Sequence, residues 1–170
     1  NTYAFIWQRT EVEENFLALL NDPKWQPLVV FPKEYAEPEQ EVFEDHIPID
    51  KNKKPLFILL DGSWREARRM YRKSPYLHQL PIVSFAADFD FGEEMKSRYQ
   101  LREAAKTGHL ATAEVAARVL ALAGEQQTAN HLDLWLDLFI HHYQKSVGQK
   151  SISNIHALAC YQTFIEDTYE

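Results

Sequence analysis

The segment LFILLDGSWREARRMYRKSP, residues 56–75, decides the fold of this chain. It begins with five consecutive apolar residues, which is typical of a strand that is buried on both faces of a parallel sheet. The run ends at Asp-Gly-Ser-Trp, where Gly62 permits a tight turn and Asp61 or Ser63 can cap a following helix. Ligands of open α/β sheets usually bind at such carboxyl strand ends, so this segment predicts the place of a site as well.

The residues after the turn predict a helix that ends near Lys73 and has two different faces. Trp64, Ala67 and Tyr71 share one face, which we expect to pack inward. The other face carries a stripe of four arginines at helical spacing: Arg65, Arg68, Arg69 and Arg72. A charged stripe is usually a solvated helix face. Arginine also binds phosphate bidentately, so the stripe is in addition a candidate phosphate contact.

Apolar runs of strand length recur along the chain and alternate with segments of helical periodicity. The predicted strands cover residues 3–7, 28–31, 56–60, 82–85 and 97–102. The predicted helices cover residues 10–20, 64–73, 111–122, 129–147 and 153–167. Thr10 and Glu13 match a capping box for the first helix, and the acidic residues 35–54 predict a surface connection. This alternation predicts an α/β fold with a mostly parallel sheet flanked by helices.

Length and composition limit the class of protein. We expect residues 1–170 to form a single domain, because this length suffices for one substantial core. The chain begins at Asn1 rather than Met, which predicts that an N-terminal segment of the full-length protein is missing. No run of 18 apolar residues and no signal-peptide pattern is visible, so we expect no membrane partner. The sequence does not fix an oligomeric state.

The single cysteine, Cys160, excludes an internal disulfide and a Cys-rich zinc site within these 170 residues. It fits a protein of the reducing cytoplasm, which is the location that we predict. The adjacent His141 and His142 point to different sides of a helix and make a poor metal pair, and no HExxH pattern or Gly-rich phosphate loop is present. We therefore predict no metal.

The distribution of charge is more informative than its sum. The net charge of -7 argues against a crude nucleic-acid binder. Residues 61–110 nevertheless hold nine Lys and Arg side chains against seven Asp and Glu side chains. A local basic face on an acidic body remains compatible with RNA binding.

The Asp-Gly-Ser-Trp turn with its arginine-rich helix resembles the DTW-domain proteins, whose signature is Asp-x-Thr-Trp. Ser63 stands where that signature usually has Thr, so a hydroxyl is kept and a methyl is lost. Residues 97–117, SRYQLREAAKTGHLATAEVAA, are also similar to the family, which carries a basic stretch before a Ser/Thr-Thr/Ala-x-Glu-x-Ala pattern. The resemblance covers roughly residues 3–145 and is strongest to the bacterial tRNA-uridine aminocarboxypropyltransferases.

This resemblance implies transfer of the 3-amino-3-carboxypropyl group from S-adenosylmethionine to N3 of a uridine in tRNA, with release of methylthioadenosine. The sulfonium is already a good leaving group, so the reaction needs no metal, only orientation of two reactants and removal of one proton. The implied fold is SPOUT-like, in which the C-terminal half is knotted around the donor. Strand periodicity cannot show a knot, and unknotted chains are the usual default.

The resemblance also implies roles for individual residues. Asp61 is the candidate base or N3-orienting acceptor, and Ser63 and Trp64 would build the catalytic pocket. Asp61 and Trp64 also have a purely structural interpretation: Asp61 as a helix cap and Trp64 as a core side chain. The RNA-binding stripe would be extended by Arg98 and Arg102. The S-adenosylmethionine site would gather strand ends and one helix start: Phe31, Pro32, Leu60, Asp61, Gly62, Ser84, Phe85, Leu110, Ala111, Thr112 and Ala113.

Three other functions stay open at this point. An RNA methyltransferase of the SPOUT type would use the same donor but transfer its methyl group. A haloacid-dehalogenase phosphatase also has a nucleophilic Asp at a strand end, but it requires a second Asp two residues later, where this chain has Ser63. A non-catalytic module would bind tRNA without any donor pocket.

Overall fold

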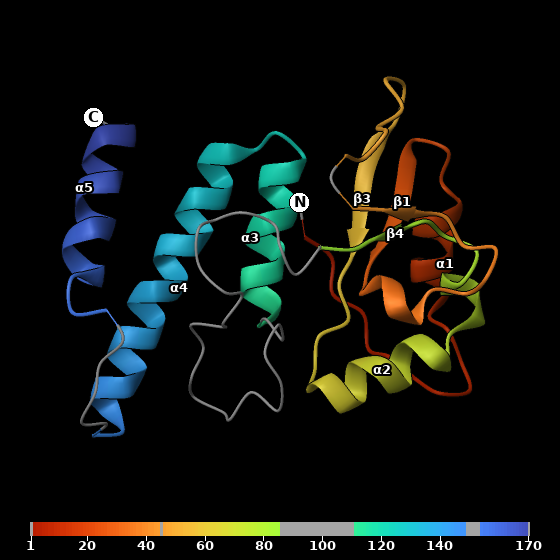
Figure 1. Cartoon of the computed structure of the whole chain (residues 1–170), viewed down its shortest axis with the longest axis horizontal. Helices are drawn as coiled ribbons and strands as arrows, with labels where there is room; N and C mark the ends of the chain where they lie inside the picture. The colour runs from red at the N-terminus through yellow and green to blue at the C-terminus, as the bar shows by residue number, and fades with distance from the viewer. Residues whose placement is uncertain (1, 45, 86–110, 149–153, 170) are drawn as a thin grey trace. The chain divides into compact units, whose positions relative to one another are not determined.

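The computed structural model describes residues 2–44, 46–85, 111–148 and 154–169 (Figure 1). The chain divides into two compact units, Asn1–Ala86 and Ala87–Glu170, and each unit is described by itself. The strand predicted over residues 97–102 lies outside the described residues. A SPOUT-like knot stays a prediction.

In the described part of the first unit, four strands form one sheet in the order β2-β4-β1-β3. The strands are β1 (Trp25–Val30), β2 (Val42–Phe43), β3 (Lys54–Ile58) and β4 (Ile82–Val83). All neighbouring strands run parallel, with Val29 beside both Ile58 and Ile82. The predicted α/β class with a parallel sheet is therefore confirmed.

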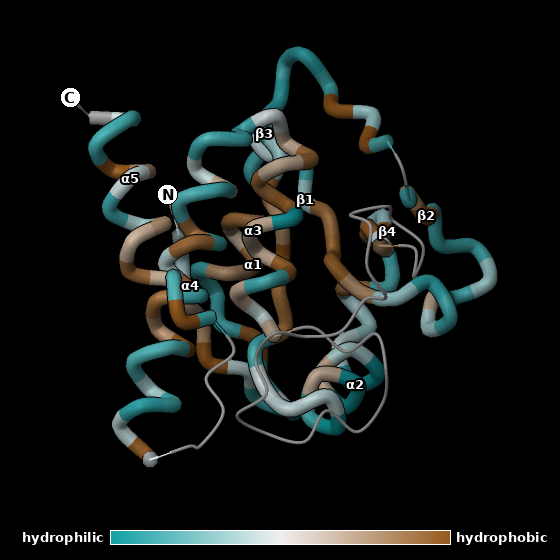
Figure 2. The backbone as a smooth tube through the Cα atoms, turned by 60° about the vertical axis from the view of Figure 1, so that its left-hand side comes forward, coloured by the Kyte–Doolittle hydropathy of each residue, from teal (hydrophilic) through white to brown (hydrophobic). Residues whose placement is uncertain are grey.

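Both faces of this sheet are buried. On one face, Val29, Ile58 and Ile82 form a hydrophobic core with Ala67 and Tyr71 of α2 (Trp64–Arg72). Phe16 and Leu20 of α1 (Glu14–Asn21) pack against the same core. The alternating side chains of the strands are buried as well: Leu28, Val30 and Val83. Unbroken apolar runs suit strands of this kind, and brown, the hydrophobic colour, marks β4 and much of β1 in Figure 2.

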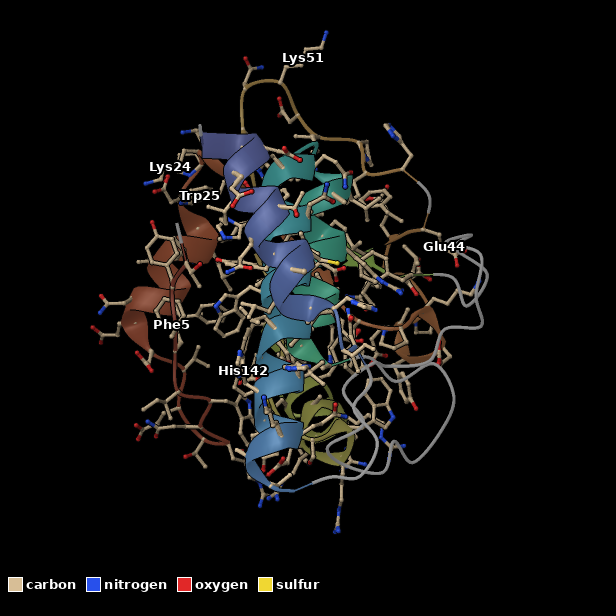
Figure 3. All side chains as sticks on the ribbon, turned by 90° about the vertical axis from the view of Figure 1, so that its left-hand side faces the viewer. Phe5, Lys24, Trp25, Glu44, Lys51 and His142 are labelled. Atoms are coloured by element: carbon tan, nitrogen blue, oxygen red, sulfur yellow. The ribbon has the colours of Figure 1, made fainter. Side chains whose placement is uncertain are left out.

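The prediction of a strand at residues 3–7 is wrong, because this segment is held by side chains instead of a ladder. Phe5 packs against Phe16 of α1 at a centroid distance of 5.0 Å (Figure 3). The indole Nε1–H of Trp7 donates to Ser74 Oγ at 3.0 Å. The Ile6 backbone N–H donates to Glu13 Oε1 at 2.8 Å. These contacts hold residues 3–7 in place as extended chain, without pairing to the sheet.

The same contact explains why the predicted capping box of Thr10 and Glu13 is wrong. The carboxylate of Glu13 binds the backbone of Ile6, and the helix that follows has no side-chain cap. That helix, α1, therefore begins at Glu14, later than the sequence pattern predicts.

Residues 35–54 hold more structure than the predicted surface connection. The short helix η1 (Lys33–Tyr35) opens the segment, and β2 adds an edge strand to β4. The Ile82 N–H donates to the Glu41 carbonyl at 2.8 Å, and the Ser84 N–H donates to the Phe43 carbonyl at 2.9 Å. A strand of two residues is too short to show a period, so the sequence pattern does not reveal it. The other short helix of this unit is η2 (Pro75–Leu77), which follows α2.

The described part of the second unit consists of α3 (Thr112–Leu122), α4 (Gln126–Ser146) and α5 (Ala157–Tyr169). These confirm the three predicted helices with shifts of a few residues at their ends. Gly124 has a φ of 84° between α3 and α4, a left-handed conformation that favours glycine after a helix. Across the residues that the structure describes, no helix combines the length and apolarity that a membrane span requires.

Candidate functional site

Parallel strands end at the same edge of a sheet, and this edge collects most of the predicted site residues of the first unit. Phe31 and Pro32 follow β1, Ser84 and Phe85 follow β4, and Leu60 to Gly62 follow β3. In Figure 1 the β3 arrow points toward the end of this unit where α2 lies. The sheet order places β1 between β4 and β3, so these segments are neighbours.

The hydroxyl of Ser63 holds the turn between β3 and α2. Ser63 is the N-cap of α2, and its Oγ accepts a hydrogen bond from the Glu66 N–H at 3.4 Å. In return, Glu66 Oε2 accepts from the Ser63 N–H at 2.8 Å and from the Ser63 hydroxyl at 2.5 Å. This is a complete capping box, so the prediction that Ser63 can cap the helix is confirmed. The two bonds made by the side chain of Ser63 need only its hydroxyl, which serine and threonine share.

Gly62 lies close to the first turn of α2 and has no unusual backbone angle. Gly124 and Gly148 have a positive φ, whereas Gly62 does not. A Cβ at Gly62 would stand 3.2 Å from the Cβ of Glu66 and 3.4 Å from its Oε2. A side chain at position 62 would therefore require Glu66 to move by a few tenths of an ångström.

Asp61 lies two residues before the N-cap of α2, and its side chain is exposed. The amino end of a helix favours negative charge nearby, which suits a carboxylate at this position. An exposed carboxylate at the carboxyl edge of a parallel sheet can accept a proton or a hydrogen bond from a ligand bound there.

Trp64 belongs to an aromatic cluster that spans two strand ends. Its indole stacks on Phe31, with centroids 5.7 Å apart and an interplanar angle of 21°. Tyr35 of η1 meets Trp64 edge-on at 6.0 Å and tilts against Phe31 at 5.5 Å. Phe31 in turn stacks on Tyr71 at 4.5 Å. We name Phe31, Tyr35, Trp64 and Tyr71 the aromatic cluster; Phe31 and Tyr71 are buried, whereas Tyr35 and Trp64 keep exposed surface.

Polar contacts fix the buried side of this cluster. The hydroxyl of Tyr71 donates to Gln40 Oε1 at 2.5 Å, and the Gln40 amide donates to the carbonyls of Leu77 and Leu80. Burial raises the pKa of Tyr71 above its usual value, and the hydrogen bond with Gln40 opposes that rise. The phenol is therefore neutral at physiological pH and acts as a hydrogen-bond donor.

The predicted basic stripe is exposed on α2, as a solvent-facing helix side should be. Its residues are Arg65, Arg68, Arg69 and Arg72. Ala67 and Tyr71, on the opposite side of the same helix, are buried. Contact of the stripe with RNA stays a prediction, and Arg98 and Arg102 lie outside the described residues.

The residues of the second unit that were predicted to bind S-adenosylmethionine lie around the start of α3. Ala111 is the N-cap, and its N–H donates to Glu114 Oε2 at 2.7 Å. Thr112 and Ala113 occupy the first turn, and Leu110 lies outside the described residues. Convergence of this turn with the strand ends of the first unit stays a prediction.

The carboxyl edge also carries an ion pair that sequence reasoning missed. Lys33 Nζ lies 2.7 Å from Glu44 Oε1. Lys33 follows β1 and Glu44 directly follows β2, so the two meet only because β4 brings these strands into one sheet. The only available signal was their position just after strands, and the strand before Glu44 was not predicted.

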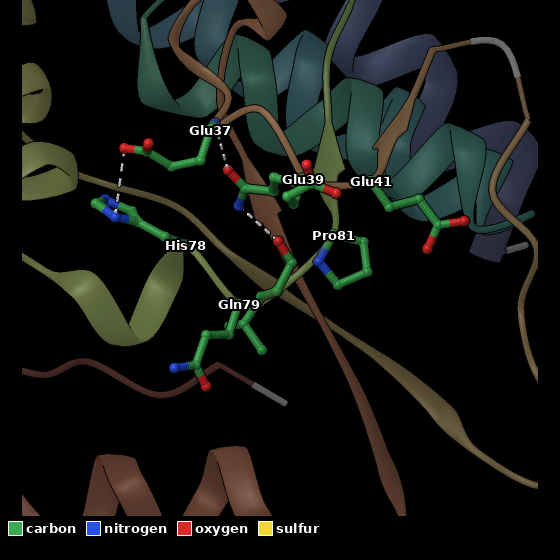
Figure 4. A pocket seen from close by; sticks show the side chains of 8 residues that line it. Glu37, Glu39, Glu41, His78, Gln79 and Pro81 are labelled. Atoms are coloured by element: carbon green, nitrogen blue, oxygen red, sulfur yellow. Dashed lines mark hydrogen bonds and ion pairs between the residues drawn. The ribbon is translucent and has the colours of Figure 1, made fainter.

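A cavity of about 350 Å³ lies elsewhere in this unit (Figure 4). Its lining includes Glu41, which precedes β2, and Pro81, which precedes β4. These positions mark the amino edge of the sheet, opposite to Asp61. His78 also lines the cavity, with Nδ1 3.6 Å from Glu37 Oε1 and Nε2 2.9 Å from the Tyr71 carbonyl. Ligands of parallel sheets favour the carboxyl edge, so we do not assign the site to this cavity.

No cluster of three or more His, Cys, Asp and Glu side chains suited to a metal ion occurs within the described ranges.

The DTW domain family matches residues 1–144 of this chain. Over 104 residues the chain is 32% identical to tRNA-uridine aminocarboxypropyltransferase 2 of Drosophila melanogaster. The aligned part is 61% of this chain and 36% of that relative, so the chain spans about a third of the relative's length. No solved structure matches the chain significantly.

Proposed function

The chain belongs to the DTW domain family, and from this premise we propose that it is an enzyme of tRNA modification. The reaction that we propose transfers the 3-amino-3-carboxypropyl group of S-adenosylmethionine to N3 of a tRNA uridine and releases methylthioadenosine. One observation carries the proposal: the family match includes the Asp61–Trp64 turn, which lies at the carboxyl edge of a parallel sheet, where ligands usually bind. The name of the Drosophila relative supports the same chemistry.

The reaction requires no covalent intermediate with the protein, only orientation of the reactants and removal of one proton. A bond forms between N3 of uridine and the methionine-derived γ carbon, the bond from that carbon to sulfur breaks, and N3 loses its proton. Holding the two reactants in line supplies much of the acceleration. In our proposal, Asp61 accepts the N3 proton or orients N3 through a hydrogen bond. Its exposed carboxylate, beside the amino end of α2, is compatible with either role.

The residues at the carboxyl edge fit the chemistry of the donor. S-adenosylmethionine carries a flat purine and a sulfonium cation, and aromatic rings bind both kinds of group by stacking and by cation–π attraction. Trp64 and Tyr35 are the members of the aromatic cluster with exposed surface. We therefore propose that these two rings contribute to the donor site. Their contacts with Phe31 would hold them in place.

The basic stripe supplies the RNA-binding part of the proposal. Four exposed guanidinium groups follow one side of α2, directly after the Asp61–Trp64 turn. Guanidinium groups bind phosphates with paired hydrogen bonds. A tRNA held along α2 would bring a nucleotide toward the carboxyl edge where Asp61 lies.

The decisive experiment is mass spectrometry of tRNA nucleosides after incubation of the full-length protein with tRNA and S-adenosylmethionine. We expect a uridine that carries the mass of the aminocarboxypropyl group, with methylthioadenosine in the supernatant. A methylated nucleoside with S-adenosylhomocysteine would assign the chain to the RNA methyltransferases instead. Binding of tRNA with no modified nucleoside would leave a non-catalytic module.

A further inference from the structure

The ion pair between Lys33 and Glu44 joins two strand ends at the carboxyl edge of the sheet. The Nζ and Oε1 atoms are 2.7 Å apart, and the side chains are 56% and 32% exposed. The paired Oε1 atom of Glu44 is itself buried, so a ligand would meet Glu44 at the exposed part of its side chain, and it would meet the Lys33 side chain more directly. Figure 3 labels Glu44 on the segment that follows β2.

The backbone beneath this pair is held firmly. The Lys33 N–H donates to Ser84 Oγ at 3.0 Å, and the Ser84 N–H donates to the carbonyl of Phe43, the residue before Glu44. Ser84 is only 2% exposed, so it acts as a buried link between the ends of β1, β4 and β2. The opposite charges of Lys33 and Glu44 are thus presented from fixed positions.

Another ion pair of the same unit offers a contrast. Lys24 and Asp22 lie two residues apart, before the start of β1, with Nζ 2.6 Å from Oδ2. That pair closes a local turn at the amino edge. An exposed ion pair adds little to stability, so stability alone does not account for a pair built across two strand ends beside a candidate site.

We propose that Lys33 and Glu44 bind the amino-acid end of S-adenosylmethionine, with Lys33 facing the α-carboxylate and Glu44 facing the α-ammonium. This inference rests on the proposed function. The ligand end is a zwitterion, and a lysine beside a glutamate is its complement in charge. Each protein charge keeps a partner of opposite sign when the ligand replaces the internal contact, so neither is left unpaired.

The position of the pair relative to Asp61 supports this assignment. The reacting carbon of the donor lies in the same short chain as the amino and carboxyl groups. Lys33 follows β1, and β3, the neighbouring strand, leads to Asp61. The stacked rings of Phe31 and Trp64 connect these two strand ends. A donor anchored at Lys33 and Glu44 would therefore point its reacting carbon toward the side of the edge where Asp61 lies.

The test compares two nucleosides by calorimetry on the full-length protein. S-adenosylhomocysteine keeps the amino-acid end, whereas methylthioadenosine lacks it. We expect the unaltered protein to bind S-adenosylhomocysteine more tightly. Lys33→Met and Glu44→Gln should each weaken that binding about tenfold or more, the scale of one charge-assisted hydrogen bond. Their affinity for methylthioadenosine should stay within about twofold, because that ligand lacks the charged end which the pair is proposed to bind.

Two further variants separate ligand binding from folding. Lys24→Met removes a lysine from the amino-edge pair and should leave both affinities unchanged. The double variant Lys33→Glu with Glu44→Lys keeps an ion pair but reverses its polarity. It should fold normally and still lose the preference for S-adenosylhomocysteine.

The outcomes are distinct. If the Lys33 and Glu44 variants keep the full preference for S-adenosylhomocysteine, the inference is overturned while the proposed function stands. If the unaltered protein binds neither nucleoside, both the proposed function and the inference fail. If the polarity-reversed variant also keeps the preference, the pair has only a structural role.

Discussion

The indole of Trp64 stacks on the ring of Phe31, with centroids 5.7 Å apart and planes inclined by 21°. This contact joins the turn after β3 to the residue that follows β1. It means that the family's tryptophan is both a packed side chain and a neighbour of the proposed site. From the sequence, Trp64 could be a core side chain or a part of the catalytic pocket, and the structure shows the packing contact directly.

Asp61→Asn tests the chemistry. The change keeps the size of the side chain and removes its charge, so turnover should fall by roughly 10²-fold or more, the usual scale of acid–base help. Because Asp61 is exposed, the unfolding midpoint should hardly change. The measurement is the single-turnover rate of tRNA modification, with thermal unfolding in parallel. Near-normal turnover in the folded variant would leave Asp61 with a structural role only.

Replacing the basic stripe tests the route of RNA binding. Arginine-to-alanine changes at Arg65, Arg68, Arg69 and Arg72 together should abolish tRNA modification but leave S-adenosylmethionine binding intact. Each phosphate contact releases counterions, so a single change should shallow the salt dependence of tRNA affinity by about one unit. Filter binding over a salt series measures this slope.

A matched control for the stripe is available on the same unit. Lys51 and Lys53 are exposed in the segment before β3, at the amino edge of the sheet. Their replacement by alanine removes positive charge without touching α2 and should leave the slope unchanged. If the fourfold arginine variant binds tRNA with an unaltered slope, the stripe is only a solvated helix face.

The capping box makes a prediction about Ser63. Ser63→Ala removes the acceptor for the Glu66 N–H and the donor to its carboxylate, so the free energy of unfolding should fall by about 1 kcal/mol. Ser63→Thr keeps the hydroxyl and should stay within about 0.5 kcal/mol of the unaltered protein. Urea unfolding measures both. Equal destabilisation by the two changes would contradict the capping role.

The buried phenol of Tyr71 predicts a loss of stability at alkaline pH. Burial raises its folded-state pKa above the ordinary value of 10.0. The folded state therefore holds this proton more tightly, so its contribution is fully present below pH 10 and is lost as pH rises through the folded pKa. Unfolding midpoints measured across this range should fall less steeply with pH in Tyr71→Phe. Identical slopes in the two proteins would show that Tyr71 does not carry the effect.

Sequence reasoning succeeded where the pattern is strong, either as an unbroken apolar run or as a helical period. The unbroken apolar run before Asp61 predicts a strand, and helical spacing predicts the two-faced helix after it and the long helix α4. The structure contains each of these elements. It failed at residues 3–7, because an aromatic run looks the same whether its side chains anchor extended chain or its backbone joins a ladder.

The candidate site was predictable only in part, for a similar reason. The site residues next to Asp61 in the sequence were predicted from the Asp-Gly-Ser-Trp turn itself. Lys33 and Tyr35 reach the same edge because β1 pairs with β3. Glu44 reaches it only through β2, a two-residue strand that the sequence pattern does not reveal. Gly62 was noted for its turn, and the structure adds the close approach of Glu66, which no local pattern reveals.

The strand order also has a consequence for how the chain folds as it is synthesised. Trp25 of β1 pairs with Lys54, and Val30 pairs with Val83, so β1 emerges from the ribosome well before either of its neighbours. Pairings between distant segments form slowly, because the intervening chain must be ordered first. Until β3 and β4 arrive, the apolar side chains of Leu28, Val29 and Val30 have no sheet to enter. The apolar half of β1 therefore stays unpaired until about fifty more residues, as far as β4, have been synthesised, and an exposed apolar segment of this kind promotes aggregation.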